Sequence, residues 1–195
     1  MSRTPKGATN QLRVIGGQWR GRKLNFTPAQ GLRPTGDRVR ETLFNWLAPD
    51  IHSARCLDLF AGSGALGLEA LSRGASHCDF VDTSAAGLAD ISRHLQTLDA
   101  SGGHCHRISA ADFLDRNAGL WDIVFIDPPF GLDLVTPAAE KLSKPGLLAP
   151  NALVYIETGR DESLPPLPTN WNQYREKSTG QVSYRLFVVA PVENV

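Results

Sequence analysis

Leu57-Asp58-Leu59-Phe60-Ala61-Gly62-Ser63-Gly64-Ala65-Leu66-Gly67 is the stretch of sequence that decides the fold. Residues 54–60 form a short, mostly apolar run typical of a buried strand, and good helix formers continue over residues 65–71. Gly62 and Gly64 give the backbone freedom between them and leave the main chain bare, so a ligand can approach it closely. This stretch predicts a strand, a glycine turn and a helix, with a nucleoside-type ligand at the carboxyl end of the strand.

The spacing Gly62-x-Gly64-x-x-Gly67 also matches the dinucleotide-binding fingerprint. Taken alone, it does not separate NAD from S-adenosylmethionine. A tight strand-to-helix turn without any ligand is the third interpretation of an isolated motif of this kind. The choice between these three depends on the rest of the chain.

Length and composition indicate one packed α/β domain. The chain has 195 residues, of which 42% are hydrophobic and 21% are charged. Residues 1–11 are polar, which is not typical of a signal peptide or a membrane span, and we expect a disordered tail there. The cysteines, Cys56, Cys78 and Cys105, each fall in a predicted strand without metal-ligand spacing, so we expect reduced thiols in a cytoplasmic protein and no metal.

The zero net charge hides an asymmetry. Residues 1–55 hold 10 Lys and Arg against 3 Asp and Glu, whereas residues 56–195 hold 10 against 17. The pattern over residues 12–24 predicts two short extended pieces around Gly16-Gly17 that carry Trp19 and four basic side chains, Arg13, Arg20, Arg22 and Lys23. Basic residues interleaved with an aromatic suit a nucleic-acid backbone, although a solvated surface arm has the same composition.

Helical and extended patterns alternate after this basic segment. Asp37 is predicted to cap a helix over residues 38–47, which Pro49 ends. Further strands are expected at residues 54–60, 77–82, 105–108, 121–127 and 153–157, and helical segments at 65–71, 84–98, 110–114 and 134–142. A hairpin formed by residues 171–177 and 182–190 follows. Repeated right-handed strand-helix-strand units predict a doubly wound, mostly parallel sheet that binds ligands at the carboxyl ends of its strands.

Four acids lie at or just past the carboxyl ends of four successive predicted strands: Asp58, Asp82, Asp112 and Asp127. In this topology the carboxyl ends of the strands share one rim of the sheet. Asp82 lies 24 residues after Asp58, near the offset of roughly 20 residues at which an acid reaches ribose hydroxyls. A carboxylate can accept two hydrogen bonds from a ribose diol, and Asp112 is placed to accept one from an adenine amino group.

Asp127-Pro128-Pro129-Phe130 ends the most apolar strand of the set. The two prolines fix φ and have no N–H, so the carbonyls of this loop are free to point outward. A carboxylate beside a proline carbonyl makes an acceptor-only pocket, which suits an exocyclic amine with two N–H donors. Phe130 offers a flat face for stacking of a base, which is worth about 1–3 kcal/mol. The alternative is a simple proline stop with Phe130 in the core.

Both motifs resemble those of the S-adenosylmethionine-dependent amino-methyltransferases. Beyond them, three segments are similar to the bacterial RsmD family, which methylates a guanine N2 amine in small-subunit ribosomal RNA. They are Arg13-Val14-Ile15-Gly16-Gly17, Arg33-Pro34-Thr35-Gly36-Asp37-Arg38-Val39-Arg40-Glu41-Thr42-Leu43-Phe44-Asn45 and Gly180-Gln181-Val182-Ser183-Tyr184-Arg185-Leu186. The resemblance runs from about Leu12 to Val189.

The resemblance implies a single-domain class I methyltransferase (Rossmann-like) with a seven-stranded sheet over residues 51–195 and a basic extension over residues 12–50. S-adenosylmethionine is the implied cofactor, with Asp58 and the glycine turn under its methionine part, Asp82 at its ribose and Asp112 at its adenine. Residues 33–40 are expected to close over cofactor and substrate. The implied cofactor set also contains Phe60, Ala61, Gly62, Ser63, Gly64, Thr83, Ala111, Thr35 and Arg38. In one departure, the family usually has Glu where Asp82 stands, which shortens the reach to the ribose by one methylene.

The implied catalytic residues are Asp127, Pro128, Pro129 and Phe130, and the implied partner is 16S ribosomal RNA of the small subunit. Arg33 joins the four basic residues of the hairpin as an RNA-binding residue, and we expect a monomer. An NAD-dependent oxidoreductase, a noncatalytic RNA-binding assembly factor, and an adenine-N6 or cytosine-N4 DNA methyltransferase remain alternatives. Trp19, Phe26 and Tyr184 are expected either to contact RNA or to pack in the core.

Overall fold

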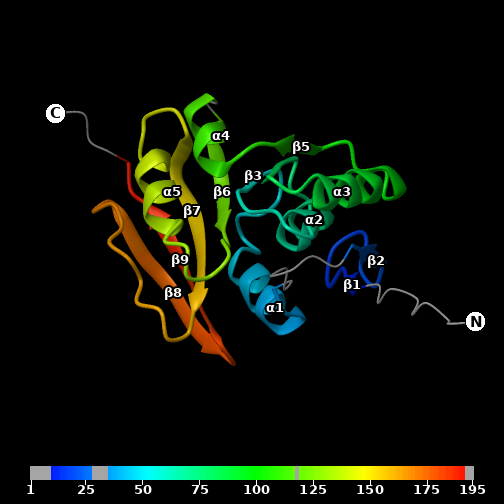
Figure 1. Cartoon of the computed structure of the whole chain (residues 1–195), viewed down its shortest axis with the longest axis horizontal. Coiled ribbons are helices and arrows are strands. Elements are labelled where there is room, and N and C mark those ends of the chain that lie inside the picture. The colour runs from blue at the N-terminus through cyan, green and yellow to red at the C-terminus, as the bar shows by residue number, and fades with distance from the viewer. Residues whose placement is uncertain (1–9, 28–34, 117–118, 192–195) are drawn as a thin grey trace, which may run out of the picture.

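A seven-stranded sheet forms the centre of the molecule (Figure 1). The computed structural model describes residues 10–27, 35–116 and 119–191. The strands of the sheet are β3 (Arg55–Asp58), β4 (His77–Asp82), β5 (Gly103–Arg107), β6 (Trp121–Ile126), β7 (Leu148–Gly159), β8 (Trp171–Thr179) and β9 (Val182–Val189). They lie in the order β5-β4-β3-β6-β7-β9-β8, and β9 runs antiparallel to both of its neighbours. The predicted α/β fold, with its mostly parallel sheet and C-terminal hairpin, is confirmed.

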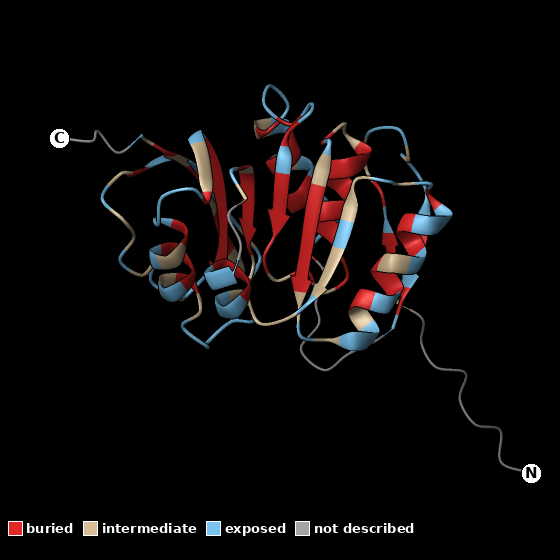
Figure 2. Ribbon diagram, turned by 90° about the horizontal axis from the view of Figure 1, so that it is seen from above, coloured by how far each residue is buried: buried red, intermediate tan, exposed pale blue. Residues whose placement is uncertain are grey.

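Helices cover both faces of the sheet, which gives three layers. They are α1 (Asp37–Trp46), α2 (Ala65–Ser72), α3 (Ala85–Thr97), α4 (Ala110–Arg116) and α5 (Val135–Leu142). Apolar side chains of α1, α2 and α3 pack in one core on one face, and those of α4 and α5 pack in a second core on the other. Figure 2 shows buried residues along the central strands and exposed residues on the outer sides of the helices. The strands are therefore buried on both faces, as their apolar runs predict.

The chain reverses its direction across the sheet between β3 and β6. It runs outward from β3 through β4 to β5 and then returns to β6, which pairs with β3 on the other side. Asp58 stands opposite Phe80 of β4 and Phe125 of β6, so the carboxyl ends of all three strands lie together. In open α/β sheets, ligands bind in the crevice outside such a switch point.

The basic extension forms a separate two-stranded sheet of β1 (Asn10–Arg13) and β2 (Lys23–Phe26). Leu12, Leu24 and Phe26 point into the core that also holds α1, α2 and α3. The strands lie further from Gly16-Gly17 than expected, because residues 14–22 form a loop fastened to α2, where the Gln18 N–H donates to the Ser72 carbonyl over 2.8 Å. The extension is thus docked on the body of the protein.

Several local predictions are wrong. Asp37 is not the cap of α1: Gly36 takes the N-cap position, and Asp37 is the first helical residue, with its carboxylate bound to Arg40. The predicted tail, residues 1–11, overlaps β1 by Asn10 and Gln11, and residues 1–9 lie outside the described residues. The last parallel strand begins five residues early, at Leu148, because it continues past Pro150 and Asn151 through an irregular register, although both residues are typical of a turn.

The structure places two of the three aromatic side chains with undecided roles in the core and packs the third, Trp19, against it. Phe26 and Tyr184 are buried, and Trp19 is partly buried against the same cluster. Tyr184 packs against Trp46 and Tyr155, with ring centroids 5.4 and 6.4 Å away. Across the described parts of the chain, we find no helix with the length and apolar character needed to span a membrane.

Candidate functional site

A cavity of about 1120 Å³ opens at the carboxyl ends of β3, β4, β6 and β7. Its wall brings together the glycine turn after β3 and the Asp-Pro-Pro-Phe loop after β6, which are more than sixty residues apart in the chain. Predicted site residues that line it are Thr35, Arg38, Asp58, Phe60, Ala61, Gly62, Ser63, Asp82, Thr83, Ala111, Asp127, Pro128, Pro129 and Phe130.

The glycine turn requires glycine for its backbone shape and for close packing. Gly62 and Gly64 both have positive φ, at 52° and 77°. Gly64 takes the N-cap position of α2, and a Cβ atom there would come within 2.8 Å of Ile91. Gly64 is not among the cavity-lining residues, so its part is to shape the turn.

Asp58 lies under the turn as a buried carboxylate. Its Oδ2 accepts a hydrogen bond from the Gly67 N–H over 3.0 Å, which ties the end of β3 to the first turns of α2. The pKa of Asp58 is raised to about 7, mainly because the carboxyl is buried. The hydrogen bond from Gly67 lowers this pKa, and the nearby carboxylates of Asp127 and Asp82 raise it. The site therefore holds a cluster of acids whose negative charges disfavour one another.

Asp82, at the end of β4, holds two backbone segments. Its Oδ2 accepts from the Gly62 N–H over 2.8 Å, and its Oδ1 accepts from the Ser84 N–H over 2.8 Å. Because each carboxylate oxygen has two lone pairs, both oxygens retain the capacity to accept a further bond from a ligand. The side chain lines the cavity beside Thr83.

Asp127 follows β6 and lines the cavity as a half-buried carboxylate. The Thr35 hydroxyl donates to its Oδ2 over 2.9 Å. Burial raises the pKa of Asp127 to about 6, while the bond from Thr35 lowers it. Pro128 is buried and Phe130 is 45% exposed, so the aromatic ring is open to a partner.

Asp112 lies outside the cavity lining. It belongs to the first turn of α4, where its carboxylate accepts from the Ser109 hydroxyl over 2.7 Å and its N–H donates to the same hydroxyl over 3.1 Å. Ile108, Ser109, Ala110 and Ala111 line the cavity at this place instead. These two bonds stabilise the start of α4, and the role of Asp112 at an adenine stays a prediction.

Glu157 is a cavity residue that the sequence analysis passed over. It is buried near the end of β7, next to β6, and accepts a hydrogen bond from the Tyr155 hydroxyl over 2.7 Å. The signal was present in the sequence, because Glu157 ends the predicted strand 153–157 as Asp82 ends the predicted strand 77–82. The hairpin turn at residues 179–182 also reaches the cavity, and no local pattern indicates that.

Four of the five predicted RNA-binding residues are exposed on the β1-β2 extension: Arg13, Arg20, Arg22 and Lys23. Arg33 lies outside the described residues. Arg40, by contrast, is a buried side chain, 1% exposed, and not part of the cavity wall. Within residues 10–27, 35–116 and 119–191, no group of three or more His, Cys, Asp or Glu could hold a metal ion.

Comparisons with known proteins agree with this architecture. The family described as Conserved hypothetical protein 95 matches residues 12–188. Ribosomal RNA small subunit methyltransferase D of Escherichia coli (strain K12) is 48% identical over 187 residues, covering 96% of this chain and 94% of the relative. The protein of the same name from Haemophilus influenzae is 48% identical over 184 residues, covering 92% and 95%. The solved structure of yhhF from Escherichia coli matches with a TM-score of 0.87 and 46% identity, over 93% of this chain and 99% of that one. The chain therefore belongs to the RsmD family, that of the ribosomal RNA small subunit methyltransferases D.

Proposed function

We propose that this protein transfers a methyl group from S-adenosylmethionine to the exocyclic N2 amine of a guanine in 16S ribosomal RNA. The observation that carries the proposal is that Asp127, Pro128 and Phe130 share one cavity with the glycine turn. An amine held at the first motif would face a cofactor held at the second. The names of the relatives in Escherichia coli and Haemophilus influenzae support ribosomal RNA of the small subunit as the substrate class.

The charge of the cavity fits this cofactor better than NAD. Four carboxylates line it, those of Asp58, Asp82, Asp127 and Glu157, against one cationic side chain, Arg38, among the described lining residues. A sulfonium and an ammonium group are attracted by such a wall, whereas a pyrophosphate would be repelled. We assign the methionine part to Asp58 and the glycine turn, the ribose to Asp82, and the adenine to residues 108–111.

The substrate amine is assigned to the acceptor pocket at Asp127. The carboxylate of Asp127 and the carbonyl of Pro128 would each accept one N–H of an exocyclic amine. Phe130, exposed at the mouth, would stack on the base and offset part of the free energy needed to take the guanine out of its stack. Exposed Arg13, Arg20, Arg22 and Lys23 would bind phosphates, which positions the RNA without reading its sequence.

The chemistry asked of these residues is orientation and charge stabilisation. The lone pair of an aromatic amine is delocalised into the ring, so the nitrogen is a poor nucleophile. Two acceptors on its N–H groups favour a pyramidal nitrogen with its lone pair aimed along one line. S-adenosylmethionine, when bound, supplies an electrophilic methyl on sulfonium. As the nitrogen is alkylated it becomes strongly acidic, and its proton can leave to Asp127 or to water.

The proposal is tested by methyl transfer from labelled S-adenosylmethionine to three substrates in parallel: purified small ribosomal subunits, protein-free 16S ribosomal RNA and duplex DNA. We expect label in the ribosomal RNA of at least one of the first two, and none in the DNA. Label in DNA alone would favour the adenine-N6 or cytosine-N4 alternative. No label in any substrate, with cofactor binding intact, would favour a noncatalytic assembly factor.

A further inference from the structure

We propose that Thr35 is a positioning residue for Asp127, and that the buried guanidinium of Arg40 holds Thr35 in that place. The inference rests on the proposed function, because it concerns the carboxylate to which we assign the substrate amine. It gives Thr35 a role other than cofactor binding, although Thr35 and Asp127 line the cavity to which we assign the cofactor.

The contact between Thr35 and Asp127 joins segments 92 residues apart in the sequence. Thr35 is 6% exposed, and its Oγ1 donates to Asp127 Oδ2 over 2.9 Å. A hydroxyl has one proton to donate, so this bond commits the Thr35 side chain to the carboxylate. The bond restrains the orientation of the carboxylate, whose remaining lone pairs can accept the substrate N–H.

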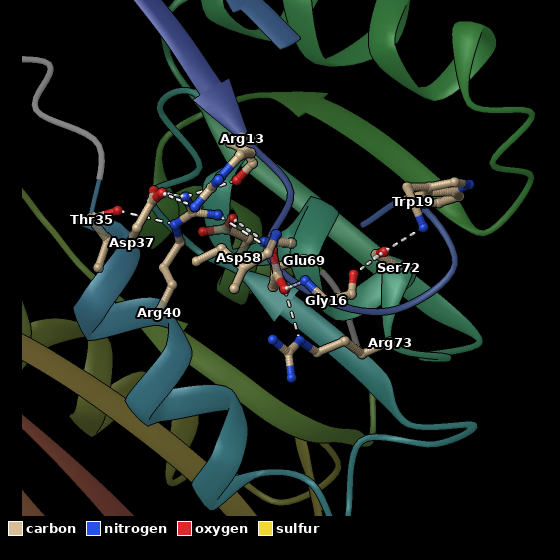
Figure 3. A network of polar contacts seen from close by, with 12 residues as sticks. Arg13, Gly16, Trp19, Thr35, Asp37, Arg40, Asp58, Glu69, Ser72 and Arg73 are labelled. Atoms are coloured by element: carbon tan, nitrogen blue, oxygen red, sulfur yellow. Dashed lines mark hydrogen bonds and ion pairs between the residues drawn. The ribbon is translucent and has the colours of Figure 1, made fainter. Parts of the chain in front are cut away.

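Arg40 holds the backbone of Thr35. Its Nε donates to the Thr35 carbonyl over 3.1 Å, and one terminal nitrogen donates to the Arg13 carbonyl over 3.0 Å and to Asp37 over 2.6 Å. The other terminal nitrogen lies 3.3 Å from Glu69 Oε2. Figure 3 shows the guanidinium among Thr35, Asp37 and Glu69. Only a planar fork with several donors can make these bonds at once, so lysine would not replace it.

Glu69 anchors the network to α2. Its carboxylate accepts from the N–H groups of Ile15 and Gly16 over 2.9 and 2.7 Å, and from Arg73 Nε over 2.8 Å. Burial lowers the pKa of Arg40, which the nearby carboxylates of Glu69 and Asp37 oppose. One buried guanidinium therefore joins the basic extension, α2 and the segment before α1. This network restrains Thr35, which in turn restrains the carboxylate of Asp127 through its hydrogen bond.

The first test replaces Thr35 by Val, which keeps the shape and removes the hydroxyl, with Thr35→Ser as the matched control. Loss of a hydrogen bond to a charged group costs about 1.5 kcal/mol, so we expect kcat to fall about 10-fold in Thr35→Val. The acid limb of the kcat profile should move to higher pH, since the bond favours the ionised carboxylate. Thr35→Ser should restore most of the turnover, and the affinity for S-adenosylmethionine should stay unchanged in both variants.

The second test needs no methyl transfer. The pKa of the Asp127 carboxyl is measured by NMR titration of protein with ¹³C-labelled aspartate, with Asp127→Asn used to assign the resonance. We expect a higher pKa in Thr35→Val than in the unmodified protein and in Thr35→Ser. An unchanged pKa in Thr35→Val would overturn the proposal. If the unmodified protein methylates no RNA but the pKa does rise, the proposed function fails while the link between Thr35 and Asp127 stands.

Arg40 is tested by a double-mutant cycle of Arg40→Lys and Thr35→Val, in which kcat is measured for each protein. If the double variant does not fold, the pKa of Asp127 is measured instead in the single Arg40→Lys protein at low temperature. Residues that act through one another are not additive. We expect Arg40→Lys to lower kcat in the Thr35 background and to add little in the Thr35→Val background. Fully additive effects, or an Asp127 pKa that Arg40→Lys leaves unmoved, would show that Arg40 does not act through Thr35.

Discussion

The N–H of Gly62 donates to Asp82 Oδ2 over 2.8 Å, and this bond joins the glycine turn after β3 to the carboxyl end of β4. Asp82 Oδ1 meanwhile accepts from Ser84 N–H over 2.8 Å at the start of α3. One carboxylate thus fixes the backbone on two sides of the cavity. A side chain assigned to the ribose also builds the turn that the rest of the cofactor would contact.

Replacing Asp82 by Ala should therefore weaken binding of S-adenosylmethionine by about 10- to 100-fold, because hydrogen bonds to a charged group contribute roughly 1.5–3 kcal/mol. Both the ribose acceptors and the support of the turn are lost. Titration calorimetry measures the change, with the exposed Asp50→Ala as the control. An affinity equal to that of the unmodified protein would refute the role of Asp82 at the ribose.

Asp127→Asn should lower turnover by about 100-fold or more while the cofactor affinity stays nearly intact, because asparagine removes the negative charge and puts an NH2 donor in place of one acceptor oxygen in a pre-organised site. The pKa of Asp127 is raised to about 6. Below that pH the carboxyl is protonated, so it loses its charge, presents an O–H donor in place of one acceptor and cannot take up the proton of the amine, and turnover of the unmodified protein should rise with pH through about 6. Initial rates from pH 5 to 8, with Asp50→Asn as control, measure this. A flat profile with full activity in Asp127→Asn would contradict the assignment.

Arg22→Ala combined with Lys23→Ala should weaken RNA binding at every sequence alike and reduce the slope of log affinity against log salt by about 2, since each lost phosphate contact reduces it by about 1. Both side chains are exposed, so the fold should be unaffected. Filter binding at several salt concentrations gives the slope. Arg116→Ala, exposed on α4 and distant from β2 in the chain, is the control, and an equal loss there would mean that the extension is not the binding surface.

Asp58→Asn should change how stability depends on pH in the protein without cofactor. Burial raises the pKa of Asp58 to about 7, so the folded protein binds this proton more tightly than the unfolded chain. This difference in proton binding stabilises the folded state fully below about pH 4. The free energy of unfolding then falls by up to about 4 kcal/mol as the pH rises to about 7. Asparagine does not titrate, so the Tm of Asp58→Asn minus that of the unmodified protein should increase from pH 4 to 7. A constant difference would contradict the raised pKa.

The sheet could be predicted from the sequence because its signals are local. Apolar runs end at Asp58, Asp82 and Ile126, and the helices between them show clear periodicity, so both the alternation and the shared rim follow from topology rules. The same rule holds for Glu157, which lies near the carboxyl end of β7 and also lines the cavity. Asp112 followed the rule and still lies outside the cavity lining, because Ser109 and the start of α4 turn its side chain to the helix.

The network around Arg40 could not be predicted, because its partners are distant in the chain. Arg40 and Glu69 are 29 residues apart, and each is a residue type that is usually exposed on a helix. Only docking of the extension on α2 makes them a buried pair. The cap of α1 was misplaced for a related reason: Asp37 is drawn to Arg40 and Arg13, so its side chain does not cap the helix.

The most direct test of the account is to identify the methylated nucleoside. Ribosomal RNA labelled by the protein is digested completely and separated by chromatography, with Asp127→Ala processed in parallel. The account predicts N2-methylguanosine as the labelled product, and at least a 100-fold lower yield from the variant. Label recovered in N6-methyladenosine or N4-methylcytidine, or an equal yield of N2-methylguanosine from Asp127→Ala, would contradict it.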